Sequence, residues 1–170
     1  LGVGISAPGP INNKDGVILE GLDSPDFNTG KRYEAPYDWR KFPLTEYLEQ
    51  EFNVPVFADN SGNISALAES WFGAGKGIQN FVQYSVGLGI GAGVIIDGLL
   101  YRGEDDVVSE IGHITVDMNG PVCTCGNIGC LELYCNFKNI LSSYYTKKKL
   151  PPRNPDEISN REIVNELQVI

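Results

Sequence analysis

The chain has 170 residues, 42% hydrophobic and 21% charged, which is typical of one ordinary globular domain or two small lobes and not of a disordered segment. A chain of this length buries roughly 70% of its unfolded surface, so its four cysteines are not needed as cross-links. Its 22 acidic and 13 basic residues give a net charge of -9, which argues against direct binding of a nucleic-acid backbone by this segment.

Membrane insertion is also not expected. The longest apolar stretch, Gly89–Ile96, is too short and too rich in glycine for the roughly 20 residues that cross a bilayer, and no signal-like segment opens the chain. We therefore expect a cytoplasmic protein. Leu1 falls inside a predicted strand and Ile170 inside a predicted helix, which indicates an excerpt, residues 1–170, of a protein with further upstream and downstream parts.

The first half of the chain predicts strands, a loop and two helices. Leu1–Ser6 is a buried strand that leads into a Pro-Gly turn, and Asp15-Gly16 marks a hairpin into a strand over 17–19. Residues 21–40 are predicted to form an ordered surface loop and not a linker, because their aromatic side chains need burial. Apolar residues at helical spacing then predict two helices, separated by a strand over 54–58. These residues are Leu44, Leu48 and Phe52 in the first helix, and Ile64, Leu67, Ala68, Trp71 and Phe72 in the second, which Gly73 and Gly75 end.

The second half continues the mixed α/β order. Strands are predicted over 81–86 and 91–96, with Asp97-Gly98 as a hairpin turn into 99–101, and a further strand over 114–116. A second apolar stripe predicts a helix that ends in a lysine run, and Ser159 and Glu162 have capping-box spacing for a last helix. The stripe consists of Leu133, Phe137, Ile140, Leu141 and Tyr144.

One histidine and three cysteines have the composition of a zinc site. His113, Cys123, Cys125 and Cys130 follow the pattern H-x9-C-x-C-x4-C in a stretch rich in glycine and proline. Three thiolates and an imidazole complete a tetrahedral zinc ligand set, whereas structural thiols usually pack singly in apolar cores. The alternative is a core histidine beside reduced cysteines. We predict one zinc ion bound by the loop 113–130, with Cys135 outside it as a buried helix thiol.

Glycines alternate at positions 87, 89, 91 and 93, between two predicted strands. They would let a backbone approach a phosphate or sugar, or they could serve a tight hairpin or close sheet packing. The pattern is not the G-x-G-x-x-G fingerprint, because Ala92 stands three positions after Gly89.

Polar residues at three places are candidates for ligand binding. Asn60 and Ser61 stand between a buried strand and a helix, where either would cap the helix, or Asn60 would reach a hydroxylated ligand at the carboxyl end of the strand. Glu110 and Glu132 flank the metal-ligand residues. Carboxylates accept hydrogen bonds from sugar hydroxyls, although both could equally be solvated.

These motifs together resemble the ROK family of bacterial sugar kinases and sugar-responsive repressors. The resemblance runs from Leu1 to about Leu133 and more weakly to Ile170. It rests on the segments GISAPGP at 4–10, DNSGN at 59–63, VGLGIG at 86–91, EIGH at 110–113 and CTCGNIGCLE at 123–132. The resemblance implies an α/β chain with the actin-like, ribonuclease-H-like fold, of which this is the central sugar-binding portion.

The resemblance also implies roles for individual residues. Asn60, Glu110, His113 and Glu132 would bind sugar hydroxyls, with His113 joining the sugar site to the zinc site. Gly87, Gly89 and Gly91 would form the phosphate loop.

Two positions depart from the kinase pattern. Ser61 stands where the kinases have the aspartate that acts as catalytic base, and Leu88 replaces the hydroxyl residue of the phosphate loop. A serine cannot take up a proton at neutral pH, and loss of a general base typically costs about 10²–10⁴-fold in rate.

We therefore predict the effector portion of a transcriptional regulator without kinase activity, which binds a monosaccharide or sugar phosphate. DNA would be bound only by an upstream segment outside this chain, and the family's common homodimer is expected. The alternative is an ATP-dependent sugar kinase that tolerates Ser61, and a third possibility is a carbohydrate-binding lobe with neither role.

Overall fold

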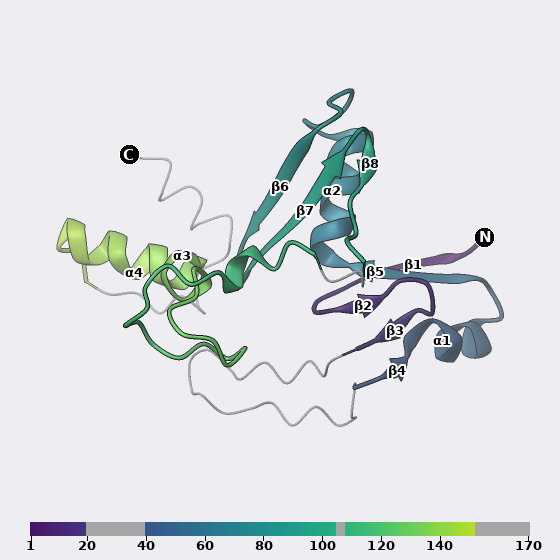
Figure 1. Ribbon diagram of the computed structural model, residues 1–170, viewed down its shortest axis with the longest axis horizontal. Helices are drawn as coiled ribbons and strands as arrows, with labels where there is room; N and C mark the ends of the chain where they lie inside the picture. The colour runs from purple at the N-terminus through teal and green to yellow at the C-terminus, as the bar shows by residue number, and fades with distance from the viewer. Residues whose placement is uncertain (20–39, 105–107, 152–170) are drawn as a thin grey trace. The chain divides into compact units, whose positions relative to one another are not determined.

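The computed structural model describes residues 1–19, 40–104 and 108–151, in two compact units (Figure 1). The first unit comprises Leu1–Tyr84 and Ala92–Glu110, and the second comprises Ser85–Gly91 and Ile111–Ile170. No helix in the described ranges is long and apolar enough to cross a membrane. The predicted loop over 21–40, except for its last residue, and the predicted last helix lie outside the described residues.

A parallel strand pair forms the centre of the first unit. Strand β1 (Val3–Ala7) pairs with β5 (Val56–Asn60) in the register Val3↔Val56 to Ala7↔Asn60. Beside it, β2 (Ile11–Asn12), β3 (Val17–Ile18) and β4 (Phe42–Pro43) form an antiparallel sheet, and helix α1 (Leu44–Phe52) follows (Figure 1). The predicted strand, hairpin and helix of this region are confirmed. Their shared apolar core consists of Ala7, Ile11, Ile18, Leu44 and Ala58.

Helix α2 (Ser61–Phe72) begins directly at the end of β5. The side chain of Asn60 caps it by accepting a hydrogen bond from the Gly62 amide at 2.7 Å, which confirms the capping prediction. The helix packs through small residues, because a side chain on Gly62 would collide with the Ala92 carbonyl and one on Gly93 with the Gly62 carbonyl. Close backbone approach, and not a large apolar face, therefore fixes the start of α2.

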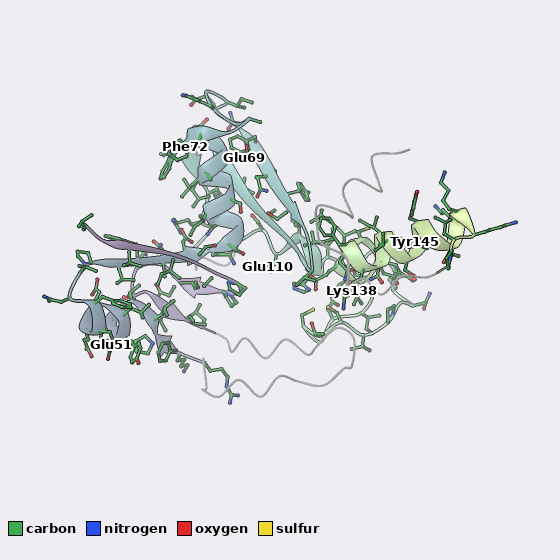
Figure 2. The ribbon with its side chains drawn as sticks, turned by 180° about the vertical axis from the view of Figure 1, so that it is seen from behind. Glu51, Glu69, Phe72, Glu110, Lys138 and Tyr145 are labelled. Carbon is green, nitrogen blue, oxygen red and sulfur yellow. The ribbon has the colours of Figure 1, made fainter. Side chains whose placement is uncertain are left out.

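The large apolar stripe of α2 is not buried as its pattern predicts. Trp71 and Phe72 are 59% and 84% exposed, and Figure 2 shows Phe72 at the end of the helix beside Glu69. The stripe lines an open apolar groove of about 490 Å³ against β1 and β5, in which Phe57 also lies. Helical periodicity identified the helix correctly, but the buried side carries Gly62, Asn63 and Ala66.

Strands β6 (Phe81–Val86), β7 (Ile90–Ile96) and β8 (Leu99–Leu100) form one three-stranded sheet, as predicted. The β7–β8 connection is the expected two-residue hairpin. Asp97 and Gly98 have φ values of 52° and 77°, the positive pair that this turn requires.

The second unit carries the metal-ligand loop and two consecutive helices. A short 3-10 helix, η1 (Ile111–His113), precedes the loop, and α3 (Glu132–Cys135) and α4 (Phe137–Lys148) follow it. The apolar stripe that begins at Leu133 was predicted as one helix. Asn136 divides it, because its backbone is extended (ψ 164°) and its side chain caps α4 by accepting from the Asn139 amide at 2.9 Å.

The strand predicted over 114–116 was wrong. The segment makes a single isolated bridge, between Thr115 and Cys130, and Ile114 and Val116 are about half exposed (53% and 52%). It cannot extend the pairing, since its partner segment holds Cys130 in the metal-ligand cluster and then turns into α3.

Candidate functional site

Four side chains in the second unit converge as a metal-ligand cluster. The ligand atoms of His113, Cys123, Cys125 and Cys130 all lie within 4.8 Å of one another. Cys123 Sγ is 3.6 Å from His113 Nδ1, and Cys125 Sγ is 3.7 Å from Cys130 Sγ. The cysteines are free thiols, since a disulfide requires about 2.05 Å. Tetrahedral zinc with Zn–S bonds of about 2.3 Å places sulfurs about 3.8 Å apart, so the donor set and its spacing suit a metal ion.

Backbone hydrogen bonds hold the cysteines in this arrangement. The Cys123 amide donates to the Asn127 carbonyl at 2.7 Å and the Gly126 amide donates to the Cys123 carbonyl at 2.9 Å, which folds the segment into a tight knuckle. Gly126 has a φ of 89°, which a residue with a side chain rarely adopts. The Asn127 side chain donates to the His113 carbonyl at 3.0 Å and so ties the knuckle to η1. The loop is therefore arranged to bring ligands from two segments together.

The thiols differ in acidity. Burial raises the pKa of Cys130 to about 12, and hydrogen bonds and charge from Cys125 and Cys123 add to the rise. Burial also raises the pKa of Cys123, but hydrogen bonds with Cys125 and His113 outweigh it and lower the pKa overall. A metal ion must therefore displace the proton of Cys130 in order to bind.

His113 and Glu132 each keep one atom available beside this cluster. His113 turns Nδ1 toward Cys123, and its Nε2 makes no hydrogen bond with the described residues. Glu132 is 6% exposed at the start of α3, and its Oε2 accepts a hydrogen bond from the Ile90 amide at 2.8 Å. Its Oε1 accepts none from the part of the chain that the structure describes. Both residues thus have one polar atom engaged by the protein and one left for a ligand.

The predicted phosphate loop covers the turn between β6 and β7 and the first two residues of β7, and we call residues 87–91 the glycine turn. The Gly87 amide donates to the Gly89 carbonyl at 2.9 Å, and the Phe137 amide at the start of α4 donates to the Gly87 carbonyl at 2.9 Å. A Cβ on Gly89 would lie 2.6 Å from Glu132 Oε2, whereas a Cβ on Gly87 or Gly91 would meet nothing within 4 Å. Of the three glycines, only Gly89 therefore stands where a side chain would collide with Glu132.

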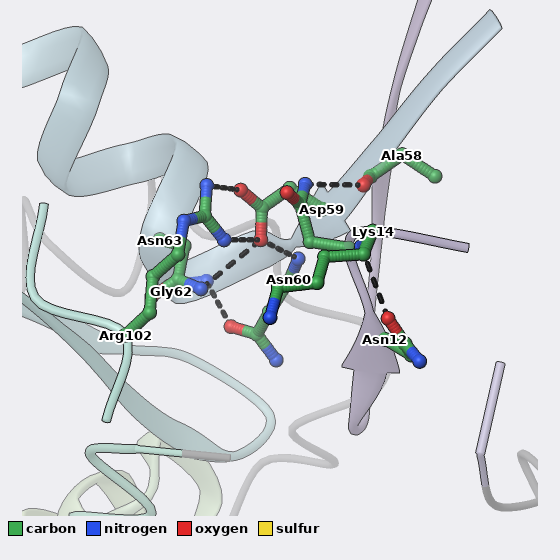
Figure 3. Close-up of polar contacts among 9 residues, drawn as sticks. Asn12, Lys14, Ala58, Asp59, Asn60, Gly62, Asn63 and Arg102 are labelled. Atoms are coloured by element: carbon green, nitrogen blue, oxygen red, sulfur yellow. Dashed lines mark hydrogen bonds and ion pairs between the residues drawn. The ribbon is translucent and has the colours of Figure 1, made fainter. Parts of the chain in front are cut away.

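In the first unit, Asp59 forms an ion pair at the carboxyl end of β5 (Figure 3). Arg102, which follows β8, donates to both carboxylate oxygens, at 2.6 Å and 3.2 Å. Asn63 Nδ2 and the Asn60 amide also donate to Oδ1. The carboxylate, with its side chain 10% exposed, is committed to these partners. Sequence analysis missed this pair, although a charged residue at the end of a buried strand is a signal that a partner is required.

Asn60 and Ser61 lie next to this ion pair. The Asn60 amide group donates to the Gly9 carbonyl at 2.9 Å in addition to capping α2, so it keeps one N–H for another acceptor. Ser61 is exposed, and its hydroxyl makes no hydrogen bond with the described residues. Glu110 is also exposed, at the end of the first unit (Figure 2).

Comparison with known proteins matches residues 1–169 to the ROK family. The chain belongs to this family. It is 41% identical over 149 residues to the xylose repressor of Bacillus spizizenii, which is 88% of this chain and 35% of that protein. It is also 41% identical over 130 residues to the glucokinase of Thermotoga maritima, covering 76% of this chain and 37% of that enzyme. Relatives of both kinds thus reach the same identity, and the chain spans about a third of the length of each.

Solved structures confirm the predicted actin-like α/β fold. A ROK family glucokinase from Streptomyces griseus, in complex with glucose and AMPPNP, superposes with a TM-score of 0.71 at 33% identity, covering 87% of this chain and 43% of that one. A ROK family transcriptional regulator described as a homologue of the Escherichia coli MLC protein gives 0.69 at 28% identity, covering 94% and 37%.

Proposed function

We propose that residues 1–170 are the carbohydrate-binding effector portion of a ROK transcriptional regulator that lacks kinase activity. The observation that carries this proposal is the state of the catalytic-base position. Ser61 is exposed, and the neighbouring carboxylate of Asp59 cannot replace the missing base because Arg102 and Asn63 already engage it. Phosphoryl transfer needs a group that accepts the proton of the attacking hydroxyl, whereas sugar binding does not.

The sugar ligands in this proposal are Asn60, Glu110, His113 and Glu132. Each has a polar atom that the described part of the protein leaves unused: an amide N–H on Asn60, Nε2 on His113, Oε1 on Glu132 and the whole carboxylate of Glu110. A mixture of donors and acceptors suits the hydroxyls of a monosaccharide or sugar phosphate, which both donate and accept hydrogen bonds. The names of the relatives place xylose and glucose first among the sugars to test.

Zinc is the metal that we propose for the cluster in the loop 113–130. His113, Cys123, Cys125 and Cys130 would hold it, because three thiolates and one imidazole match its preference and leave no open coordination position. A closed zinc site would serve as a structural cross-link. His113 would keep its ring fixed by Nδ1 and present Nε2 to the sugar.

Sugar binding is tested by calorimetric titration of the full-length protein with a panel of monosaccharides and their phosphates. Glu110→Gln and Glu132→Gln are each expected to weaken the best ligand by about 1.5–3 kcal/mol, roughly ten- to hundredfold, because a hydroxyl loses its charged acceptor. Glu51→Gln, at an exposed position on α1, serves as the matched control and should bind as the parent does. Parental affinity in both site variants would place the sugar site elsewhere.

The kinase alternative is favoured by the 41% identity to a glucokinase and by the TM-score of 0.71 with a glucokinase structure. A coupled assay with ATP and the tightest-binding sugar separates the two functions. We expect no useful turnover from the parent, and because Leu88 also departs from the kinase pattern, the fair rescue is Ser61→Asp combined with Leu88→Thr. Parental turnover of about 1 s⁻¹ or above, the lower end of ordinary enzymes, would make the protein a kinase.

We further propose that the full-length protein is a homodimer and binds DNA through a segment upstream of Leu1. Xylose repressors are among its relatives, and residues 1–170 have a net charge of -9, which disfavours DNA binding by these residues themselves. Light scattering of the full-length protein checks the dimer. A gel-shift assay with and without residues upstream of Leu1 checks DNA binding, and retention of DNA by residues 1–170 alone would contradict this assignment.

A further inference from the structure

We propose that Gly89 is a positioning residue for sugar binding, which seats the Glu132 carboxylate against the glycine turn. This inference rests on the proposed sugar-binding function and assigns a purpose to Gly89 other than approach to a phosphate. Three observations in the second unit carry it: the contact of Gly89 with Glu132, the hydrogen bond at Ile90, and the contrast with the neighbouring glycines.

The Glu132 side chain lies across the glycine turn in a space that only glycine leaves open. A Cβ at position 89 would stand 2.6 Å from Oε2, which is far inside van der Waals contact, and 3.4 Å from Cδ. The carboxylate would have to move away, since it is the far end of a flexible side chain and the turn is backbone. The same oxygen accepts a hydrogen bond from the Ile90 amide at 2.8 Å, so displacement of the carboxylate would also break this hydrogen bond.

The backbone around Ile90 is held firmly enough to act as a seat. The Phe137 amide donates to the Gly87 carbonyl at 2.9 Å on one side of the turn. On the other, Gly112 lies so close to the Ile90 carbonyl that a Cβ there would collide with it. Because Oε2 is fixed by this backbone, Oε1 has a defined direction, and preorganisation of this kind lowers the entropy lost on binding a ligand.

The neighbouring glycines show that the contact with Glu132 is specific to position 89. A Cβ on Gly87 or Gly91 would meet no atom within 4 Å, and neither glycine, nor Gly89, has a positive φ. Alanine is therefore tolerated by the backbone at all three positions. Only at position 89 does it meet Glu132.

The test compares Gly89→Ala with Gly4→Ala in the full-length protein, by calorimetric titration with the monosaccharide that binds the parent most tightly. Gly4 has no proposed role in binding, and a Cβ there would meet nothing within 4 Å. We expect Gly89→Ala to weaken binding at least tenfold, and Gly4→Ala to stay within twofold of the parent. Parental affinity of Gly89→Ala would overturn the proposal. An equal loss in both variants would overturn it as well, because the loss would then not come from the contact with Glu132.

A double-mutant cycle, with the melting temperature as the measurement, tests the contact between Gly89 and Glu132 in the absence of sugar. Gly89→Ala is expected to lower the melting temperature of the parent by about 2–4 °C, as the loss of one hydrogen bond would. It should have no effect in the Glu132→Ala background, where the side chain that it displaces is absent. An equal decrease in melting temperature in both backgrounds would refute the claim that Gly89 positions Glu132. If no sugar in the panel binds the parent, the proposed function fails, and the positioning role fails with it, while the cycle still reports whether Gly89 seats Glu132.

Discussion

The ion pair at the start of α2 offers a sharp test of the energetics in the first unit. Arg102→Met removes the guanidinium while keeping an unbranched apolar stem in its place. Arg102 is the only described residue that donates to Asp59 Oδ2, at 2.6 Å. The variant therefore leaves one oxygen of a charged, nearly buried carboxylate without a partner among the residues that the structure describes.

The magnitude of the effect follows from the exposure of the two side chains. Removal of one partner from a fully buried pair costs about 3–5 kcal/mol. Here the Asp59 side chain is 10% exposed and that of Arg102 is 30% exposed, so water can enter where the guanidinium was. Asp59 also keeps its hydrogen bonds from Asn63 and from the Asn60 amide. We therefore expect the free energy of unfolding to fall by about 2–3 kcal/mol, below the fully buried value.

Urea unfolding of the full-length protein, followed by tryptophan fluorescence and circular dichroism, measures this loss. Lys14→Met is the control, because Lys14 is exposed and its ammonium forms no ion pair with a described residue, and it should change stability by less than about 0.5 kcal/mol. Asp59→Asn combined with Arg102→Met should cost less than the sum of the single changes. A loss in Arg102→Met no larger than in Lys14→Met would refute this reasoning.

Three further predictions concern the metal-ligand cluster and the packing of α2. Metal analysis of the purified parent should give one zinc per chain. Cys125→Ser should lose most of this zinc, since it removes one of four ligands of a site whose binding free energy in small modules is about 10 kcal/mol or more. Well under one equivalent of zinc in the parent would contradict the proposed site. Acidification from about pH 8 to 5 should release the metal, because protons compete with it for the thiolates and the pKa of Cys130 is raised to about 12 in the metal-free protein. A chromogenic chelator measures the release. Metal retention that does not depend on pH would exclude thiolate ligation. Gly62→Ala and Gly93→Ala should each lower the free energy of unfolding by about 1–3 kcal/mol, measured by thermal unfolding. Gly4→Ala is the control and should leave stability near that of the parent, because its Cβ would meet nothing within 4 Å. Equal effects of all three changes would show that backbone contact does not hold α2.

Local sequence signals were sufficient for most of the secondary structure. Helical spacing placed α1 and α2, and Asp97-Gly98 placed the β7–β8 hairpin, because both features depend on residues only a few positions apart. The ligand types at His113 and the three cysteines likewise predicted the cluster that the structure brings together, since the chemistry of thiolates and imidazole hardly depends on the fold around them.

Tertiary structure decided which faces are buried and which polar groups meet. The apolar stripe of α2 predicts a buried face, but the close approach of Gly62 to β7 turned a different side of the helix inward. The pairing of Asp59 with Arg102 joins residues 43 positions apart, and that of Glu132 with the Ile90 amide joins residues 42 apart. No local pattern encodes such contacts, because they arise only when packing removes both groups from water and each must find a partner.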